Sequence, residues 1–203
     1  MSSSPFYKKA GNRYMDPLTN KWTVKILPGE FFVCTPEEQV IVTTLGSCIS
    51  ACIWDRSLGL GGMNHFMLAE SEVGAWGAHG TASTRFGNFA MEFLINEILK
   101  QGGRREKLRA KIFGGASMNT GGEKVGHANI AFAETYLKTE RIPLIAEDTG
   151  GKLARKVYFE PGTGEVRVKK LEDLKNDTIT RREKSYVKNL EKQNQSEDDV
   201  LLF

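Results

Sequence analysis

Residues 42–69 read VTTLGSCISACIWDRSLGLGGMNHFMLA, and this stretch decides how the rest of the chain is interpreted. Its apolar and β-branched residues predict strands at 40–44, 48–54 and 60–68. Residues of the second strand alternate between two faces, with Cys48, Ser50, Cys52 and Trp54 on one and Ile49, Ala51 and Ile53 on the other. The stretch therefore predicts neighbouring strands, with Cys48 at the start of one and His65 on the next.

Cys48 and His65 form a candidate pair of nucleophile and base. A cysteine attacks as the thiolate, so the pKa of its thiol must fall from about 8.5. A nearby imidazole achieves this and later returns the proton to a leaving group. Adjacent strands lie about 4.8 Å apart, so one residue on each can come within hydrogen-bond reach. Thr43 or Thr44, one strand earlier, could orient the imidazole as a third member.

Gly46 and Ser47 precede the cysteine in a predicted turn. Glycine permits a sharp turn and the close approach of a substrate backbone. Main-chain N–H groups in such a turn can point at a developing oxyanion. We therefore expect these two residues to form an oxyanion site beside Cys48.

Both candidates also have a purely structural interpretation. A cysteine in an apolar strand is often a buried thiol, and a lone histidine in NHFML can be a core residue. A metal site is not expected, because Cys48 and Cys52 on one strand would have Cα atoms about 13 Å apart. That distance is too great for a shared zinc ion or a disulfide, and we expect neither a metal nor a cofactor.

The rest of the chain predicts an α/β protein with layered architecture and a mixed sheet. Helical periodicity is clearest at 81–99, and a second helix is expected at 124–139. Further strands are expected at 31–34, 110–113, 142–147, 156–159 and 166–169. The loop 114–119 follows a short buried strand, so we expect Ser117 and Asn119 to border the active cleft. The alternative for this loop is a tight turn that requires glycine.

We expect three segments along the chain. Residues 1–28 are polar and contain three prolines, which is typical of an arm over the surface, with a short edge strand near 22–26. Residues 29–170 form the main domain. Residues 171–203 form a polar C-terminal extension. Its apolar end, VLLF at 200–203, docks on this domain or on a partner, or else stays a frayed end.

The composition is that of an ordinary soluble globular protein, with 40% hydrophobic and 26% charged residues among 203. No apolar run approaches the roughly 20 residues that a membrane helix needs, and the N-terminus lacks a signal-peptide core, so we expect a cytoplasmic protein. Three cysteines argue against a disulfide framework. The formal net charge of +3 is too small to indicate nucleic-acid binding.

The motif TTLGSC…GGMNHFMLA resembles the chemoreceptor glutamine deamidase family, CheD. The resemblance covers residues 16–170 and continues through RFGNFAMEFLINEILKQGG, KIFGGASMN, VGHANIAFAETYL and IPLIAEDTGGKLARKVYFEPGTGEV. It departs at Ala69, where the family usually has proline, and at Val42, where some members have threonine. A regular strand gives Thr44 the parity of Val42, whereas a bulge would favour Thr43.

The resemblance implies an α/β/α sandwich related to the cytotoxic necrotizing factor deamidases. It implies that Cys48 is the nucleophile, that His65 is the base, and that an upstream threonine completes a triad which converts receptor glutamines to glutamates. It also implies chemoreceptors as partners, together with a CheC-type phosphatase. The alternatives are a regulatory binding module for these partners, and a cysteine protease or amidase acting on small substrates.

Overall fold

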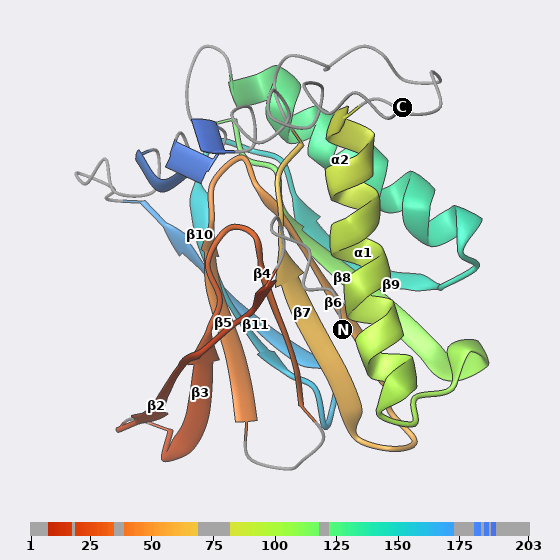
Figure 1. Ribbon diagram of the computed structural model, residues 1–203. Coiled ribbons are helices and arrows are strands. Elements are labelled where there is room, and N and C mark those ends of the chain that lie inside the picture. The colour runs from red at the N-terminus through yellow and green to blue at the C-terminus, as the bar shows by residue number, and fades with distance from the viewer. Residues whose placement is uncertain are drawn as a thin grey trace, which may run out of the picture.

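The computed structural model describes residues 8–17, 19–34, 39–68, 82–117, 122–172, 181–183, 185–186 and 188–189. Asn119 and the apolar end at 200–203 lie outside these residues. Two mixed β-sheets and two long helices dominate the described part of the chain (Figure 1).

The first sheet has six strands in the order β1 (Lys8–Lys9), β4 (Glu30–Cys34), β7 (Leu60–His65), β6 (Ile49–Asp55), β8 (Leu108–Gly114) and β9 (Leu144–Thr149). The second has five, in the order β11 (Glu165–Leu171), β10 (Ala154–Glu160), β5 (Gln39–Leu45), β3 (Lys21–Lys25) and β2 (Asn12–Asp16). The helices are α1 (Ala82–Lys100) and α2 (Gly122–Thr139), and a 3₁₀ turn spans Arg105–Lys107.

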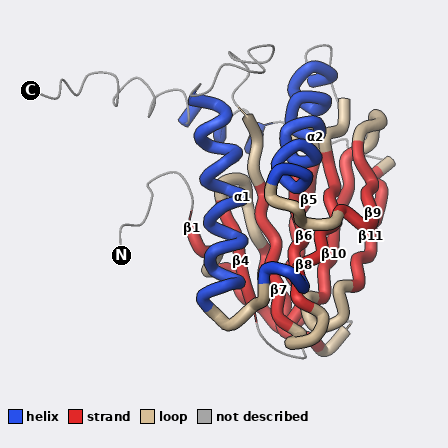
Figure 2. The backbone as a smooth tube through the Cα atoms, turned by 90° about the vertical axis from the view of Figure 1, so that its right-hand side faces the viewer, coloured by secondary structure: helices blue, strands red, loops and turns tan. Residues whose placement is uncertain are grey.

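Both long helices cover one face of the six-stranded sheet (Figure 2). Met91, Leu94 and Ile98 of α1 are completely buried there. The helix ends at Lys100, and the chain turns away through Gly102, whose φ of 101° suits glycine. The N–H of Gly103 donates to the carbonyl of Ile98. Helix α1 therefore begins and ends close to where the apolar periodicity predicted.

The opposite face of the six-stranded sheet packs on the five-stranded sheet. Strand β6 has the alternation that its sequence predicted: Ile49, Ala51 and Ile53 join the core under the helices, while Cys48, Cys52 and Trp54 join the core between the sheets. The α/β class with mixed sheets is confirmed. In the described residues the third layer is the five-stranded sheet, where a second layer of helices was expected. Periodicity in the sequence shows that one face of a sheet is buried but not which element covers it.

Residues 8–25, expected to form an arm, supply strands to both sheets. Strand β1 pairs in parallel with β4, and β3 lies between β2 and β5. Val24 and Ile26 are buried in the core between the sheets. A strand at the edge of a sheet can have one polar face toward solvent. Polar composition alone therefore does not distinguish a surface arm from an edge strand.

Candidate active site

Cys48 and His65 lie on the same face of the six-stranded sheet. Cys48 directly precedes β6, and His65 ends β7. The antiparallel register pairs Ile49 with Phe66, which makes His65 a diagonal neighbour of Cys48 on the side toward the second sheet. Sγ of Cys48 lies 3.8 Å from Sδ of Met67. Within the described residues no hydrogen bond joins this sulfur to His65.

Thr43 fixes the imidazole of His65. Its Oγ1 lies 2.7 Å from Nδ1 of His65 and also donates to the carbonyl of Ile26 at 2.9 Å. The hydroxyl has one proton, so when it donates to Ile26 it must accept from Nδ1–H. This network assigns the proton of the neutral ring to Nδ1 and leaves a lone pair on Nε2. Nε2 is buried and has no hydrogen-bond partner among the described residues.

Thr44 does not reach the histidine. Strand β5 pairs with β10 in regular register, with Thr43 opposite Val157 and Thr44 opposite Lys156. Thr43 lies on the face of Ile41 and Leu45, which belong to the core between the sheets. Thr44 would face the histidine only if Val42 did so too, because the two residues share a strand face. Val42 lies on the other face of β5 in this chain, and no bulge is needed to bring Thr43 to His65.

The electrostatics of His65 keep it neutral. Burial lowers the pKa of its imidazole to about 3. A neutral ring with a free Nε2 is a proton acceptor, which is the state that a general base needs before it takes a proton.

Three backbone N–H groups converge beside Cys48 and form an anion nest, the name we give to the N–H groups of Gly46, Ser47 and Cys48. All three donate to the carboxylate of Glu183, at 3.0, 3.3 and 3.3 Å respectively. The Ser47 hydroxyl donates to the same carboxylate at 2.7 Å. The turn expected to hold an oxyanion therefore holds an anion in the structure, and that anion comes from the C-terminal extension.

The surroundings of Cys48 favour the neutral thiol over the thiolate. This residue is completely buried, and burial, followed by the charge of Glu183 and a hydrogen bond to its carboxylate, raises the pKa of its thiol well above the usual value. Burial also raises the pKa of Cys34, to about 12, and that of Cys52. The thiolate expected at Cys48 is thus disfavoured while Glu183 is in place.

Asn129 of α2 holds the turn from the other side. Its Nδ2 donates to the carbonyl of Ser47 at 2.8 Å, and its Oδ1 accepts from the N–H of Leu68 at 2.8 Å. The side chain is fully buried. The candidate site residues named from the sequence do not include Asn129. Its place on the buried face of a predicted helix is a signal for such a role, since buried amides need partners.

The glycine-rich loop after β8 contacts the same turn through its backbone. The N–H of Gly115 donates to the carbonyl of Cys48 and that of Ala116 to the carbonyl of Gly46, both at 2.7 Å. Gly114 has a φ of 115°, and a Cβ there would lie 2.2 Å from the carbonyl oxygen of Cys48. The N–H of Ser117 instead donates to the carbonyl of Gly151. The start of the loop therefore borders the candidate site, and the positive φ of Gly114 fits the tight turn that requires glycine.

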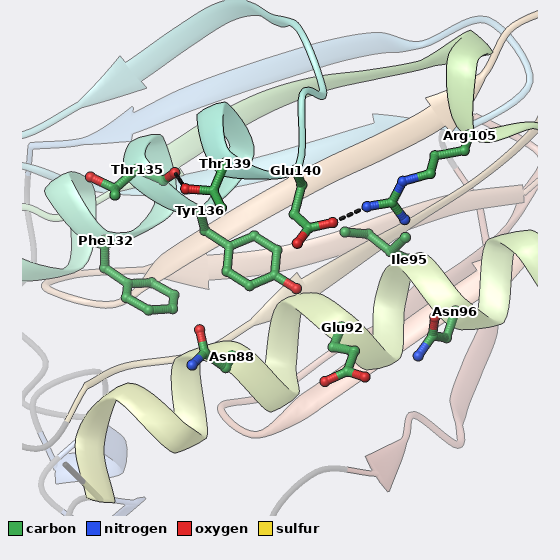
Figure 3. Close-up of a pocket in the computed structure, with 10 residues that line it drawn as sticks. All are labelled: Asn88, Glu92, Ile95, Asn96, Arg105, Phe132, Thr135, Tyr136, Thr139 and Glu140. Carbon is green, nitrogen blue, oxygen red and sulfur yellow. Dashed lines mark hydrogen bonds and ion pairs between the residues drawn. The ribbon is translucent and has the colours of Figure 1, made fainter. Parts of the chain in front are cut away.

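A separate groove of about 630 Å³ runs between α1 and α2 (Figure 3). Glu92 and Tyr136 line it, and Arg105 forms an ion pair with Glu140 at one end. None of the candidate site residues lines this groove.

The described residues contain neither a cluster of metal-ligating side chains nor a helix that could span a membrane. Across them, no group of three or more His, Cys, Asp or Glu side chains is placed to hold a metal ion. Neither of the two long helices in the described part of the chain combines the length and the hydropathy required to span a bilayer.

Comparisons with known proteins give a consistent picture. A family model described as CheD chemotactic sensory transduction matches residues 67–170. Three curated relatives carry the name "Probable chemoreceptor glutamine deamidase CheD". That from Halorhodospira halophila is 49% identical over 95% of this chain and 89% of its own length. That from Methylobacillus flagellatus is 48% identical over 96% of both chains, and that from Thiobacillus denitrificans is 46% identical over 100% of both.

Among solved structures, a Neisseria meningitidis protein of the DUF152 family model covers 60% of this chain and 53% of its own. Its TM-score is 0.39 and its sequence identity is 10%, which is too low to support a conclusion about fold or function.

Proposed function

This chain belongs to the CheD family, and we propose that it hydrolyses glutamine side chains of chemoreceptors to glutamate and releases ammonia. The names of the curated relatives supply the substrate class. One observation supports the chemistry most directly: the free Nε2 of His65, oriented by Thr43, lies on the sheet face of Cys48 and its anion nest.

In the acylation half, the thiol proton of Cys48 passes to Nε2 of His65. The thiolate attacks the carboxamide carbon of the substrate glutamine, and the anion nest stabilises the oxyanion that forms. His65 then donates its proton to the departing nitrogen. Ammonia leaves, and the substrate side chain is held as a thioester on Sγ.

In the hydrolytic half, His65 removes a proton from a water molecule that attacks the thioester carbon. The second oxyanion is held by the same N–H groups, and the carbon–sulfur bond breaks. The thiolate regains a proton from His65, and the product is a glutamate on the receptor. The roles of Cys48, His65, Thr43 and the nest need no metal or organic cofactor.

Mass spectrometry of receptor cytoplasmic fragments tests this function. We expect selected glutamine residues to gain the mass difference between an amide and a carboxylic acid, with no chain cleavage. Cleaved fragments would instead indicate a protease, and unmodified fragments that bind tightly would indicate a regulatory binding module.

The proposal also includes a cytoplasmic location, because the cytoplasmic parts of the receptors are the proposed substrates. It includes a CheC-type phosphatase as a regulatory partner.

Replacing Thr43 with valine is expected to lower kcat about tenfold with little change in KM, because one hydrogen bond that orients the base is lost. Thr43→Ser should restore most of the rate, since it retains the hydroxyl. Thr44→Val is the matched control on the adjacent residue and should leave kcat unchanged. A larger loss in Thr44→Val than in Thr43→Val would show that the wrong threonine has been assigned. Initial rates of ammonia release measure both parameters.

A further inference from the structure

The carboxylate in the anion nest comes from the chain's own C-terminal extension. Residues 181–183, 185–186 and 188–189 are helical, and we call them the C-terminal segment; in Figure 1 these short blue pieces lie beside the turn between β5 and β6. Glu183 is 8% exposed although it carries an ionisable group. Four donors satisfy it, three from the backbone and one from the Ser47 hydroxyl. A buried carboxylate with this many donors occupies a built site.

A second side chain anchors the same segment. Tyr186 lies three residues after Glu183, so both point to the same side of a helix. It packs against the core between the sheets, to which Cys48 belongs. Burial raises the pKa of its phenol. Glu183 and Tyr186 therefore form a two-point contact, one polar in the nest and one aromatic beside it.

The chemical identity of the anchoring residue matters for a deamidase. Glutamate is the product of glutamine deamidation, and its carboxylate differs from the substrate amide only by an oxygen in place of nitrogen. Glu183 places that carboxylate on the N–H of Cys48 itself, where the reaction needs the oxygen of the substrate. The negative charge and the burial both oppose ionisation of the thiol.

We propose that the C-terminal segment acts as a built-in product mimic, in which Glu183 occupies the glutamine site and Tyr186 an adjoining apolar site, so that this segment must leave before a receptor enters. This assignment rests on the deamidase function proposed above. It also defines the ligand that the site accepts, namely a glutamine presented on a helix with a bulky side chain three residues later.

Glu183→Gln converts the mimic into a substrate. Cys48 should attack the side-chain carbonyl carbon of the introduced glutamine, ammonia should leave, and water should hydrolyse the thioester to regenerate glutamate and the free thiol. Peptide mass spectrometry at position 183 follows this conversion in the full-length protein. Its rate constant should not depend on protein concentration, because the reaction is intramolecular. The double variant Glu183→Gln with Cys48→Ala should retain the amide.

Glu183→Ala opens the site without providing a substrate. We expect iodoacetamide to alkylate Cys48 about 10- to 100-fold faster than in the wild-type protein, because several charge-assisted hydrogen bonds that hold the segment are lost. Receptor deamidation should rise in parallel. Glu172→Ala, which removes an exposed carboxylate just after β11, is the matched control and should alkylate at the wild-type rate.

Two results overturn this inference. One is an unchanged alkylation rate in Glu183→Ala, which is measured without any receptor and so does not depend on deamidation. The other is an introduced glutamine that remains an amide in a Glu183→Gln protein that deamidates receptor fragments. Failure of the proposed function has a different signature, in which faster alkylation of Glu183→Ala accompanies receptor fragments that no variant modifies.

Discussion

Cys48→Ala is expected to abolish glutamine deamidation, lowering kcat/KM at least about 10⁴-fold, because no other group in the site can form the thioester. Alanine removes only the sulfur atom, which lies against Sδ of Met67. The fold should therefore persist, with a loss of about 1 kcal/mol or less in unfolding free energy. Receptor mass spectrometry measures the activity, and thermal denaturation checks the fold.

Cys52→Ala is the matched control. Cys52 is also completely buried in the core between the sheets, four residues further along the same strand face. It lies away from the anion nest, so its loss should leave the rate near that of the wild-type protein. A Cys48→Ala protein that still deamidates, or a Cys52→Ala protein that folds but does not, would contradict the assignment of the nucleophile.

The location of Cys48 and His65 on one sheet face could be predicted from the sequence. Strand alternation has a period of two, so the position of each apolar residue in β6 also fixes the face of Cys48. The short connection from β6 to β7 then brings the neighbouring strand alongside, and His65 follows. Local patterns were sufficient here because both residues belong to consecutive strands.

Which of the two threonines contacts His65 could be decided only from the structure. Thr43 and Thr44 are adjacent, so they point to opposite faces, and the sequence does not tell which face of β5 meets the six-stranded sheet. Both Val42 and Ile41 are buried, so hydrophobicity does not distinguish the faces. Alternation puts Thr43 on the face of Ile41, and only the packing of one sheet on the other shows that this face meets His65.

The role of Glu183 could not be predicted from the sequence, for a different reason. It contacts Cys48 across 135 residues of chain, and it belongs to a polar extension that we expected to lie outside the main domain. An acidic residue in such a segment is usually solvated. Its burial depends on the convergence of Gly46, Ser47 and Cys48 N–H groups, which exists only after the turn has formed.

The thiol chemistry explains why a covering carboxylate is an effective switch. Cys48 needs a nearby proton acceptor and an unoccupied oxyanion site before it can react. Glu183 fills the oxyanion site and adds a like charge beside the developing thiolate, so it opposes both requirements with one side chain. A receptor that displaces it removes both effects at once, which couples substrate binding to activation of the nucleophile.

His65→Gln is expected to lower kcat about 10²- to 10⁴-fold, because the reaction loses the group that shuttles the proton in both halves. The amide of glutamine fills much of the space of the imidazole but does not take up a proton. His127→Gln, which changes an exposed histidine of α2, is the control and should retain the wild-type rate. Wild-type kcat in His65→Gln would remove the base from the mechanism.

The same variant should change the acid stability of the fold. Because burial lowers the pKa of His65 to about 3, the unfolded chain binds a proton that the folded protein excludes between about pH 6.5 and 3. In this window the unfolded state holds more protons than the folded state. His65 therefore lowers the free energy of unfolding by up to about 1.4 kcal/mol for each unit by which the pH falls. Urea unfolding at several pH values should therefore show a shallower acid loss in His65→Gln than in His127→Gln. Equal acid losses in the two variants would show that His65 ionises freely and is not the buried neutral base that the mechanism requires.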